Sequence, residues 1–99
     1  MIRHVVLLKL RDAEQAPQIF SALNNLQSQI PGIIKISAGT DSSPEGLQRG
    51  FTHGFTVDFV DEGARDGYLP HPAHQKVGAM IVAACEGGVD GVLVLDWEI

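Results

Sequence analysis

The chain has 99 residues and a mass of 10.6 kDa, enough for one domain and too little for two independent cores. Apolar residues make up 44% and charged residues 19%, which excludes disordered, collagen-like and low-complexity chains. Twelve acidic residues against seven basic ones give a net charge of −5, and there is no basic run. We therefore expect neither nucleic acid nor a membrane surface as a partner.

The cysteine content and the start of the chain bear on the compartment. Cys85 is the single cysteine and cannot form an internal disulfide, which favours a reducing, cytoplasmic location. The apolar residues at the N-terminus are few and are soon followed by Lys9, so we expect neither a signal peptide nor a membrane span.

The first half of the chain predicts a strand, a helix and a second strand. Residues 2–10 are rich in Val, Ile and Leu, and both faces of this predicted strand are apolar in the middle, so both are expected to be covered. Pro17 suits the first turn of a helix, which Pro31 and Gly32 end. Its apolar stripe follows helical spacing: Ile19, Leu23, Leu26 and Ile30. Residues 33–38 then resume a β pattern.

The second half predicts two more strands separated by a helix in two pieces. Residues 51–60 alternate in polarity, and the face that carries His53 is the apolar one. A short helix is expected over residues 61–69, and Pro72 can open a further helix that runs to about Cys85. The last strand, residues 92–99, places Val92, Val94 and Asp96 on one face.

The order of these elements predicts an α+β fold of the ferredoxin-like βαββαβ type. Such a fold has a four-stranded antiparallel sheet with both helices on one face. The other face would expose a large apolar patch, made of Val5, Leu7, Leu93, Leu95 and Trp97. Because soluble monomers rarely expose such patches, we expect a homodimer in which two copies stack sheet to sheet about a two-fold axis.

Four histidines and one tyrosine are the candidates for chemistry. His4 and His53 each occupy a strand face that is otherwise apolar, and we expect them to converge beneath the corner that holds Tyr68, His71 and His74. Imidazoles in a partly apolar pocket can titrate near neutrality and move protons. A tyrosine hydroxyl beside them can donate a hydrogen bond to a developing oxyanion.

Structural roles compete with catalysis for each of these side chains. A buried histidine is often only a hydrogen-bonded core residue, which applies to His4 and His53. His71 lies between two prolines and can simply order the corner, while His74 can either cap the last helix or point into the pocket. His71 and His74 are spaced like zinc ligands, but further ligands are missing, so we expect no metal. Phosphate-binding and nucleophile-elbow motifs are absent.

Four segments together resemble the stress-responsive A/B barrel family, also called Dabb: residues 1–7, 50–53, 68–74 and 94–98. The resemblance spans residues 1–99 and implies a dimeric α+β barrel. The corner from Tyr68 to His74 is also similar to that of a plant polyketide cyclase of this family, which uses no metal or organic cofactor. That likeness implies His74 as the base, Tyr68 as the oxyanion partner, and His53 and His4 as pocket histidines.

Two functions remain open on the sequence. The first is a cofactor-independent cyclase or isomerase acting on a small, mostly apolar carbonyl compound, polyketide-like or aromatic. Its substrate would contact His71 and an apolar wall: Val6, Leu8, Phe20, Leu23, Val57, Val77 and Val94. The second is a non-catalytic dimer that binds a small ligand or acts as a stress-related scaffold. A weak metal-dependent function through His71 and His74 is a third, less favoured reading.

Overall fold

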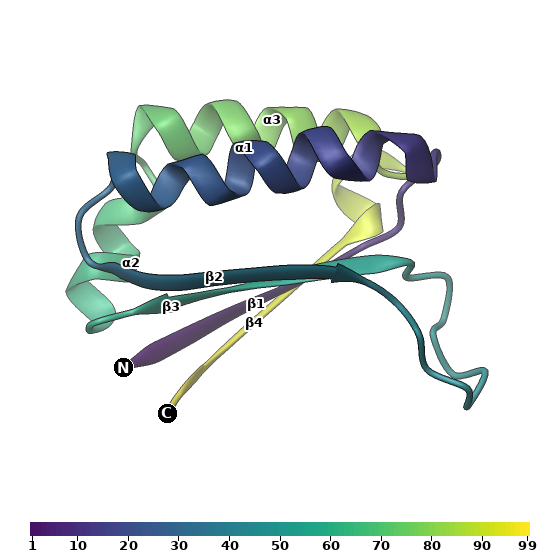
Figure 1. Ribbon diagram of the computed structural model, residues 1–99, viewed down its shortest axis with the longest axis horizontal. Helices are drawn as coiled ribbons and strands as arrows, with labels where there is room; N and C mark the ends of the chain where they lie inside the picture. The colour runs from purple at the N-terminus through teal and green to yellow at the C-terminus, as the bar shows by residue number, and fades with distance from the viewer.

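The computed structural model describes all 99 residues, and it has two layers (Figure 1). The main elements are β1 (Ile2–Leu8), α1 (Ala16–Gln29), β2 (Ile33–Thr40), β3 (His53–Phe59), α2 (Glu62–Tyr68), α3 (Pro72–Ala84) and β4 (Val92–Glu98). All strand pairs are antiparallel, in the order β2-β3-β1-β4. Helices α1 and α3 cover one face of this sheet, and α2 lies at one end between the layers. The ferredoxin-like α+β prediction is confirmed.

Several element ends differ from the sequence-based expectation. The first strand ends at Leu8 rather than Leu10, because Leu10 leaves the sheet and forms an isolated bridge with Cys85. The third strand begins at His53, two residues later than expected, while the second continues to Thr40 to pair with it. These shifts leave the faces of β1 and β3 residues unchanged, since side chains alternate with a period of two, whereas a register shift between Ile33 and Lys35 interrupts the alternation at the start of β2.

Local sequence explains where the helices begin. The Asp61 carboxylate accepts a hydrogen bond from the Ala64 backbone N–H at 2.8 Å and caps α2. His71 caps α3, because its Nδ1 accepts the Ala73 N–H at 3.1 Å and Pro72 follows as the first helical residue. Each cap satisfies a backbone donor that the helix cannot satisfy itself.

The core lies between the sheet and the helices. On β1 the residues Ile2, His4, Val6 and Leu8 are buried, and they alternate with half-buried residues on the other face. The helices supply the opposite half of the core: Ile19, Leu23, Leu26, Val77 and Ile81. The side of the sheet that faces the helices is therefore the side that the sequence predicted.

The helix-free face of the sheet is apolar and open in a single chain. The strand register places Val5 beside Leu95, and Leu7 beside Leu93. Leu95 is 58% exposed and Trp97 is 48% exposed, values that are high for large apolar residues. The predicted apolar patch is thus present on the predicted face.

One ion pair interrupts this face at the end that carries the N-terminus. The Arg3 guanidinium donates two hydrogen bonds to the Asp58 carboxylate, at 2.9 and 3.0 Å. This pairing lowers the pKa of the buried Asp58 below its ordinary value of 3.8. Separately, none of the helices combines the length and apolar character that crossing a membrane requires.

Candidate active site

Tyr68 is the centre of a buried cluster of rings. It is the last residue of α2, and its side chain is fully buried. Its ring lies 4.1 Å from the ring of His74, 4.9 Å from that of Phe59 and 5.9 Å from that of His4, measured between centroids. Burial raises the pKa of the phenol, so the side chain stays neutral and keeps its proton to donate.

The Tyr68 hydroxyl has no hydrogen-bond partner in the protein, and it is the single buried side-chain polar atom in that condition. Buried polar groups are almost always paired, because leaving one unpaired costs about 1–3 kcal/mol. Each unpaired group of this kind calls for an explanation, and a role in catalysis is one of them. The hydroxyl is therefore the strongest single indication of a site in this molecule.

His74 presents a free basic nitrogen next to Tyr68. Its Nδ1 lies 2.9 Å from the carbonyl oxygen of Leu69, which can only accept, so the Nδ1–H donates and Nε2 carries the lone pair. Partial burial lowers the pKa of His74 below its ordinary value of 6.5. The imidazole is consequently neutral at neutral pH and able to accept a proton at Nε2.

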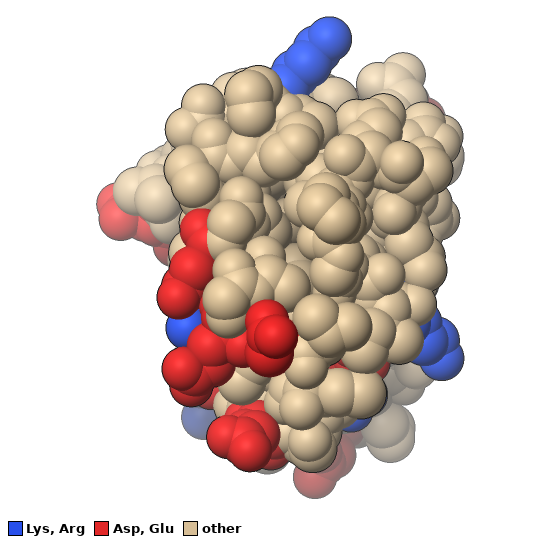
Figure 2. Space-filling model, turned by 90° about the vertical axis from the view of Figure 1, so that its left-hand side faces the viewer, with Lys and Arg blue, Asp and Glu red and all other residues tan.

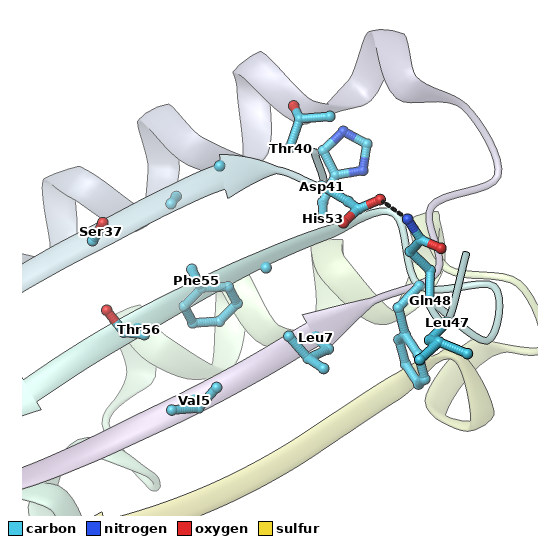
Figure 3. Close-up of a pocket in the computed structure, with 14 residues that line it drawn as sticks. Val5, Leu7, Ser37, Thr40, Asp41, Leu47, Gln48, His53, Phe55 and Thr56 are labelled. Carbon is cyan, nitrogen blue, oxygen red and sulfur yellow. Dashed lines mark hydrogen bonds between the residues drawn. The ribbon is translucent and has the colours of Figure 1, made fainter. Parts of the chain in front are cut away.

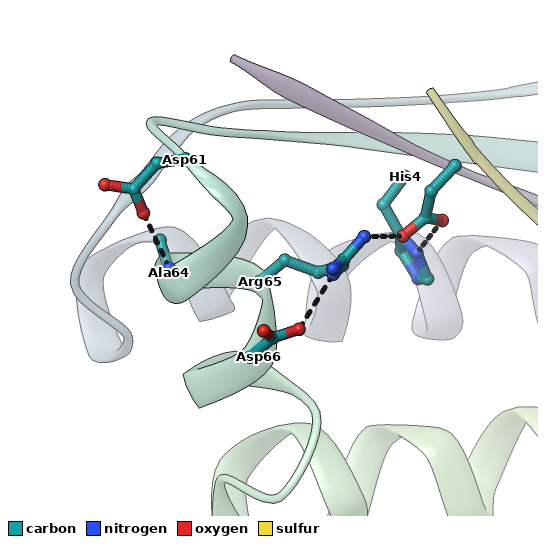
Figure 4. Close-up of polar contacts among 6 residues, drawn as sticks. His4, Asp61, Ala64, Arg65 and Asp66 are labelled. Atoms are coloured by element: carbon teal, nitrogen blue, oxygen red, sulfur yellow. Dashed lines mark hydrogen bonds and ion pairs between the residues drawn. The ribbon is translucent and has the colours of Figure 1, made fainter. Parts of the chain in front are cut away.

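His4 contacts an acidic residue of the neighbouring strand β4. Its Nδ1 lies 2.7 Å from Asp96 Oδ1, and the second carboxylate oxygen accepts a bond from Arg65 at 3.2 Å (Figure 4). Arg65 in turn donates to Asp66 at 3.0 Å. One chain of polar contacts thus joins α2 to β4 and β1. Its buried end is His4.

The expected convergence of His4 and His53 does not occur. Both histidines point toward the helices, but His53 pairs with Leu8 in the sheet register, whereas His4 pairs with Val57. The two positions are four residues apart along β1, which is roughly 13 Å at the usual rise of a strand. His53 instead contacts Thr52 Oγ1 at 2.7 Å and lies beside the ring of Phe20.

The other predicted site residues occupy two kinds of position. His71 caps α3, in agreement with the reading that it orders the corner. Most of the predicted apolar wall is buried between the sheet and the helices, with Phe20 half-buried: Val6, Leu8, Leu23, Val57 and Val77. Val94 is on the predicted face but 50% exposed, because β4 is an edge strand that diverges from the helices (Figure 1).

A hollow of about 510 Å³ lies on the helix-free face of the sheet, away from Tyr68 and His74, and His53 is among the residues that line it (Figure 3). Val5 and Leu7 of β1 line it together with Leu47 and Gln48 of the loop after β2. A smaller hollow of about 220 Å³ lies between α1 and α3. Neither includes Tyr68 or His74, and no three His, Cys, Asp or Glu side chains group closely enough to hold a metal ion.

Comparison with known proteins identifies the family. The profile of the stress responsive A/B barrel domain, Dabb, matches residues 2–99. The chain belongs to this family. A stress-response A/B barrel domain-containing protein of Arabidopsis thaliana, HS1, is 30% identical over 100 residues, which cover 98% of this chain and 88% of that protein.

Two solved structures of relatives extend the likeness to three dimensions. A dimeric ferredoxin-like protein of unknown function from Jannaschia sp. CCS1 is 34% identical with a TM-score of 0.88, covering 99% of this chain and 98% of that one. Hydroxynitrile lyase from Passiflora edulis is 26% identical with a TM-score of 0.86, covering 99% and 92%. At least one protein with this architecture is therefore described as an enzyme.

The sequence indicated Tyr68 and His74 correctly as neighbours but did not find the charged side of the site. Nothing in the sequence indicated a functional role for Arg65, because an arginine on a short acidic helix is usually a solvated surface residue. Asp96 was placed on the helix-facing side of its strand, yet its contact with His4 joins residues 92 positions apart. Only the pairing of β1 with β4 could show it.

Proposed function

We propose that this A/B barrel protein is a cofactor-independent acid–base enzyme for a small, mostly apolar carbonyl compound, polyketide-like or aromatic. The unpaired Tyr68 hydroxyl carries the proposal. A carbonyl or enolate oxygen of the substrate would accept its hydrogen bond, and His74 Nε2 would remove a proton from the adjacent carbon. A neutral donor and a neutral base side by side suit proton abstraction next to a carbonyl.

The surroundings support an uncharged substrate. Most of the cluster consists of rings and aliphatic side chains, and a charged ligand placed among them would lose its hydration without compensation. The α2 end of the molecule, seen in Figure 2, is largely uncharged, with acidic side chains gathered along one side. A relative that is a hydroxynitrile lyase adds support for enzymatic chemistry on this scaffold.

A deuterium-exchange assay tests this without knowledge of the product. Candidate ketones and β-polyketones are incubated with the protein in D2O, and proton loss beside the carbonyl is followed by NMR. His74→Ala and Tyr68→Phe are each expected to lose about 10²–10³ of the exchange rate, the range for removing one base or one oxyanion donor. Exchange that persists unchanged in His74→Ala contradicts the proposal, and Gln75→Ala, at the exposed position that follows His74 on α3, is the control.

A non-catalytic, ligand-binding or scaffold role is the second candidate. One observation favours it: the two hollows described above lie away from Tyr68 and His74. Ligands that raise the melting temperature equally in wild type and His74→Ala, without any exchange, would support this role.

We also propose that the functional unit is a homodimer formed through the helix-free face. Leu95 and Trp97 are about half exposed in one chain, and the relative from Jannaschia is described as dimeric. A second copy would cover both the apolar patch and the hollow in Figure 3. The buried, unpaired thiol of Cys85 supports a reducing compartment such as the cytoplasm.

A further inference from the structure

The polar chain behind His4 divides one carboxylate between two partners. Asp96 Oδ1 is 2.7 Å from His4 Nδ1, and Asp96 Oδ2 is 3.2 Å from the Arg65 guanidinium. Figure 4 shows Arg65 reaching from α2 toward His4. Each carboxylate oxygen therefore has its own fixed donor.

This arrangement determines which nitrogen of His4 carries the proton. An ionised carboxylate only accepts hydrogen bonds, so the Nδ1 that faces Asp96 must be protonated. In the neutral ring the lone pair is then on Nε2, on the far side from Asp96. The ring of His4 packs edge-on against that of Tyr68, with 5.9 Å between the centroids, and the Tyr68 hydroxyl has no partner of its own.

Asp96 by itself would hold His4 poorly. Its side chain is 22% exposed on a strand at the edge of the sheet, where a free carboxylate can turn toward water. The guanidinium of Arg65 restrains it, because one N–H donates to Asp96 Oδ2 while Nε is held by Asp66, so the second carboxylate oxygen has a charged donor when Oδ1 faces His4.

We propose that Arg65 is a positioning residue that acts through Asp96 to keep His4 in the tautomer with hydrogen on Nδ1. The charged and titratable groups that face this unit are Tyr68 and Asp66 from α2 and His74 from α3. The role of the tautomer in turnover rests on the proposed function. With an acceptor on His4 and a donor on Tyr68, the site would suit a substrate that carries a hydroxyl near its carbonyl group. The hydroxyl would donate to His4 and the carbonyl oxygen would accept from Tyr68.

NMR of the ¹⁵N-labelled full chain tests the proposal directly. Long-range ¹H–¹⁵N correlations report the tautomer of each imidazole, recorded at a pH above the titration of all four histidines. In the wild type we expect His4 in the Nδ1–H form alone. In Arg65→Gln we expect both tautomers, because the carboxylate is released and histidine in water favours hydrogen on Nε2.

Two further variants distinguish an effect of the Arg65–Asp96 contact on His4 from a general loss of stability in α2. Asp66→Ala removes the other partner of Arg65 and leaves the bond to Asp96, so His4 is expected to stay as in the wild type. Arg65→Lys keeps the charge and one donor and is expected to restore the single tautomer. Arg65→Met, which keeps the apolar stem, replaces the Gln variant if that one folds poorly.

A His4 that stays wholly in the Nδ1–H form in Arg65→Gln and Arg65→Met overturns the proposal, since Arg65 then only ties α2 to the sheet. The tautomer is read without substrate, so this result is independent of the deuterium-exchange assay. If exchange occurs, Arg65→Gln is expected to slow it about 10–100-fold, as is common when a group that orients a functional histidine is lost.

Discussion

Replacing Tyr68 with phenylalanine is expected to make the protein more stable and less active at once. The mutation deletes one oxygen atom that is buried and has no partner, and it leaves the ring in place. Removing such an atom recovers the cost of burying it unpaired, about 1–3 kcal/mol. For a domain of this size, each kcal/mol raises the melting temperature by about 4–8 °C.

The assay is thermal unfolding by calorimetry at one fixed protein concentration, because dimerisation makes the melting temperature depend on concentration. Tyr68→Ala is the control for the ring, which packs on Phe59 and His74. It is expected to cost about 3–5 kcal/mol, as for other buried aromatic residues.

A melting temperature of Tyr68→Phe that is unchanged or lower would refute this reasoning. It would mean that the hydroxyl has a stabilising partner in the resting protein and is not kept free for a ligand. A gain in stability together with a loss of deuterium exchange is the combination expected of a functional group that the fold accommodates at a cost.

The remaining predictions concern the dimer, pH and one turn. Leu95→Glu should halve the mass measured by light scattering, since each buried leucine contributes about 1.5–3 kcal/mol to the interface. Val89→Glu should leave the mass unchanged, because Val89 is exposed and lies outside the sheet. The free energy of unfolding should fall as pH drops below 6.5, because His74 binds a proton more readily in the unfolded chain than in the folded protein. The denaturant midpoint of His74→Gln should fall less with pH than that of the wild type. Equal falls would contradict the assignment. The Arg3–Asp58 contribution, present above pH 3.8, is lost only as pH falls further. Gly32→Ala should cost about 2–5 kcal/mol in chemical denaturation, from a positive φ plus overpacking, because its new Cβ would lie 2.5 Å from Ala64 Cβ. Gly46→Ala, with a positive φ but open space, should cost only about 1–2 kcal/mol.

Local patterns in the sequence determined the elements and the direction in which their side chains point. The alternation in β1 and β3 fixed which residues face the helices, since a strand has a period of two whatever its partners are. The caps at Asp61 and the start of α3 at Pro72 were likewise readable, because capping uses residues next to one another in the chain. The bare apolar face followed from the order of the elements alone.

The tertiary structure decided how far apart the inward-facing groups lie. Alternation placed His4 and His53 on the same side, but the antiparallel register of β1 and β3 set them four residues apart. The same pairing brought Asp96 to His4, and the packing of α2 brought Arg65 to Asp96. Register and helix docking depend on contacts between distant segments, so no local pattern in the chain encodes them.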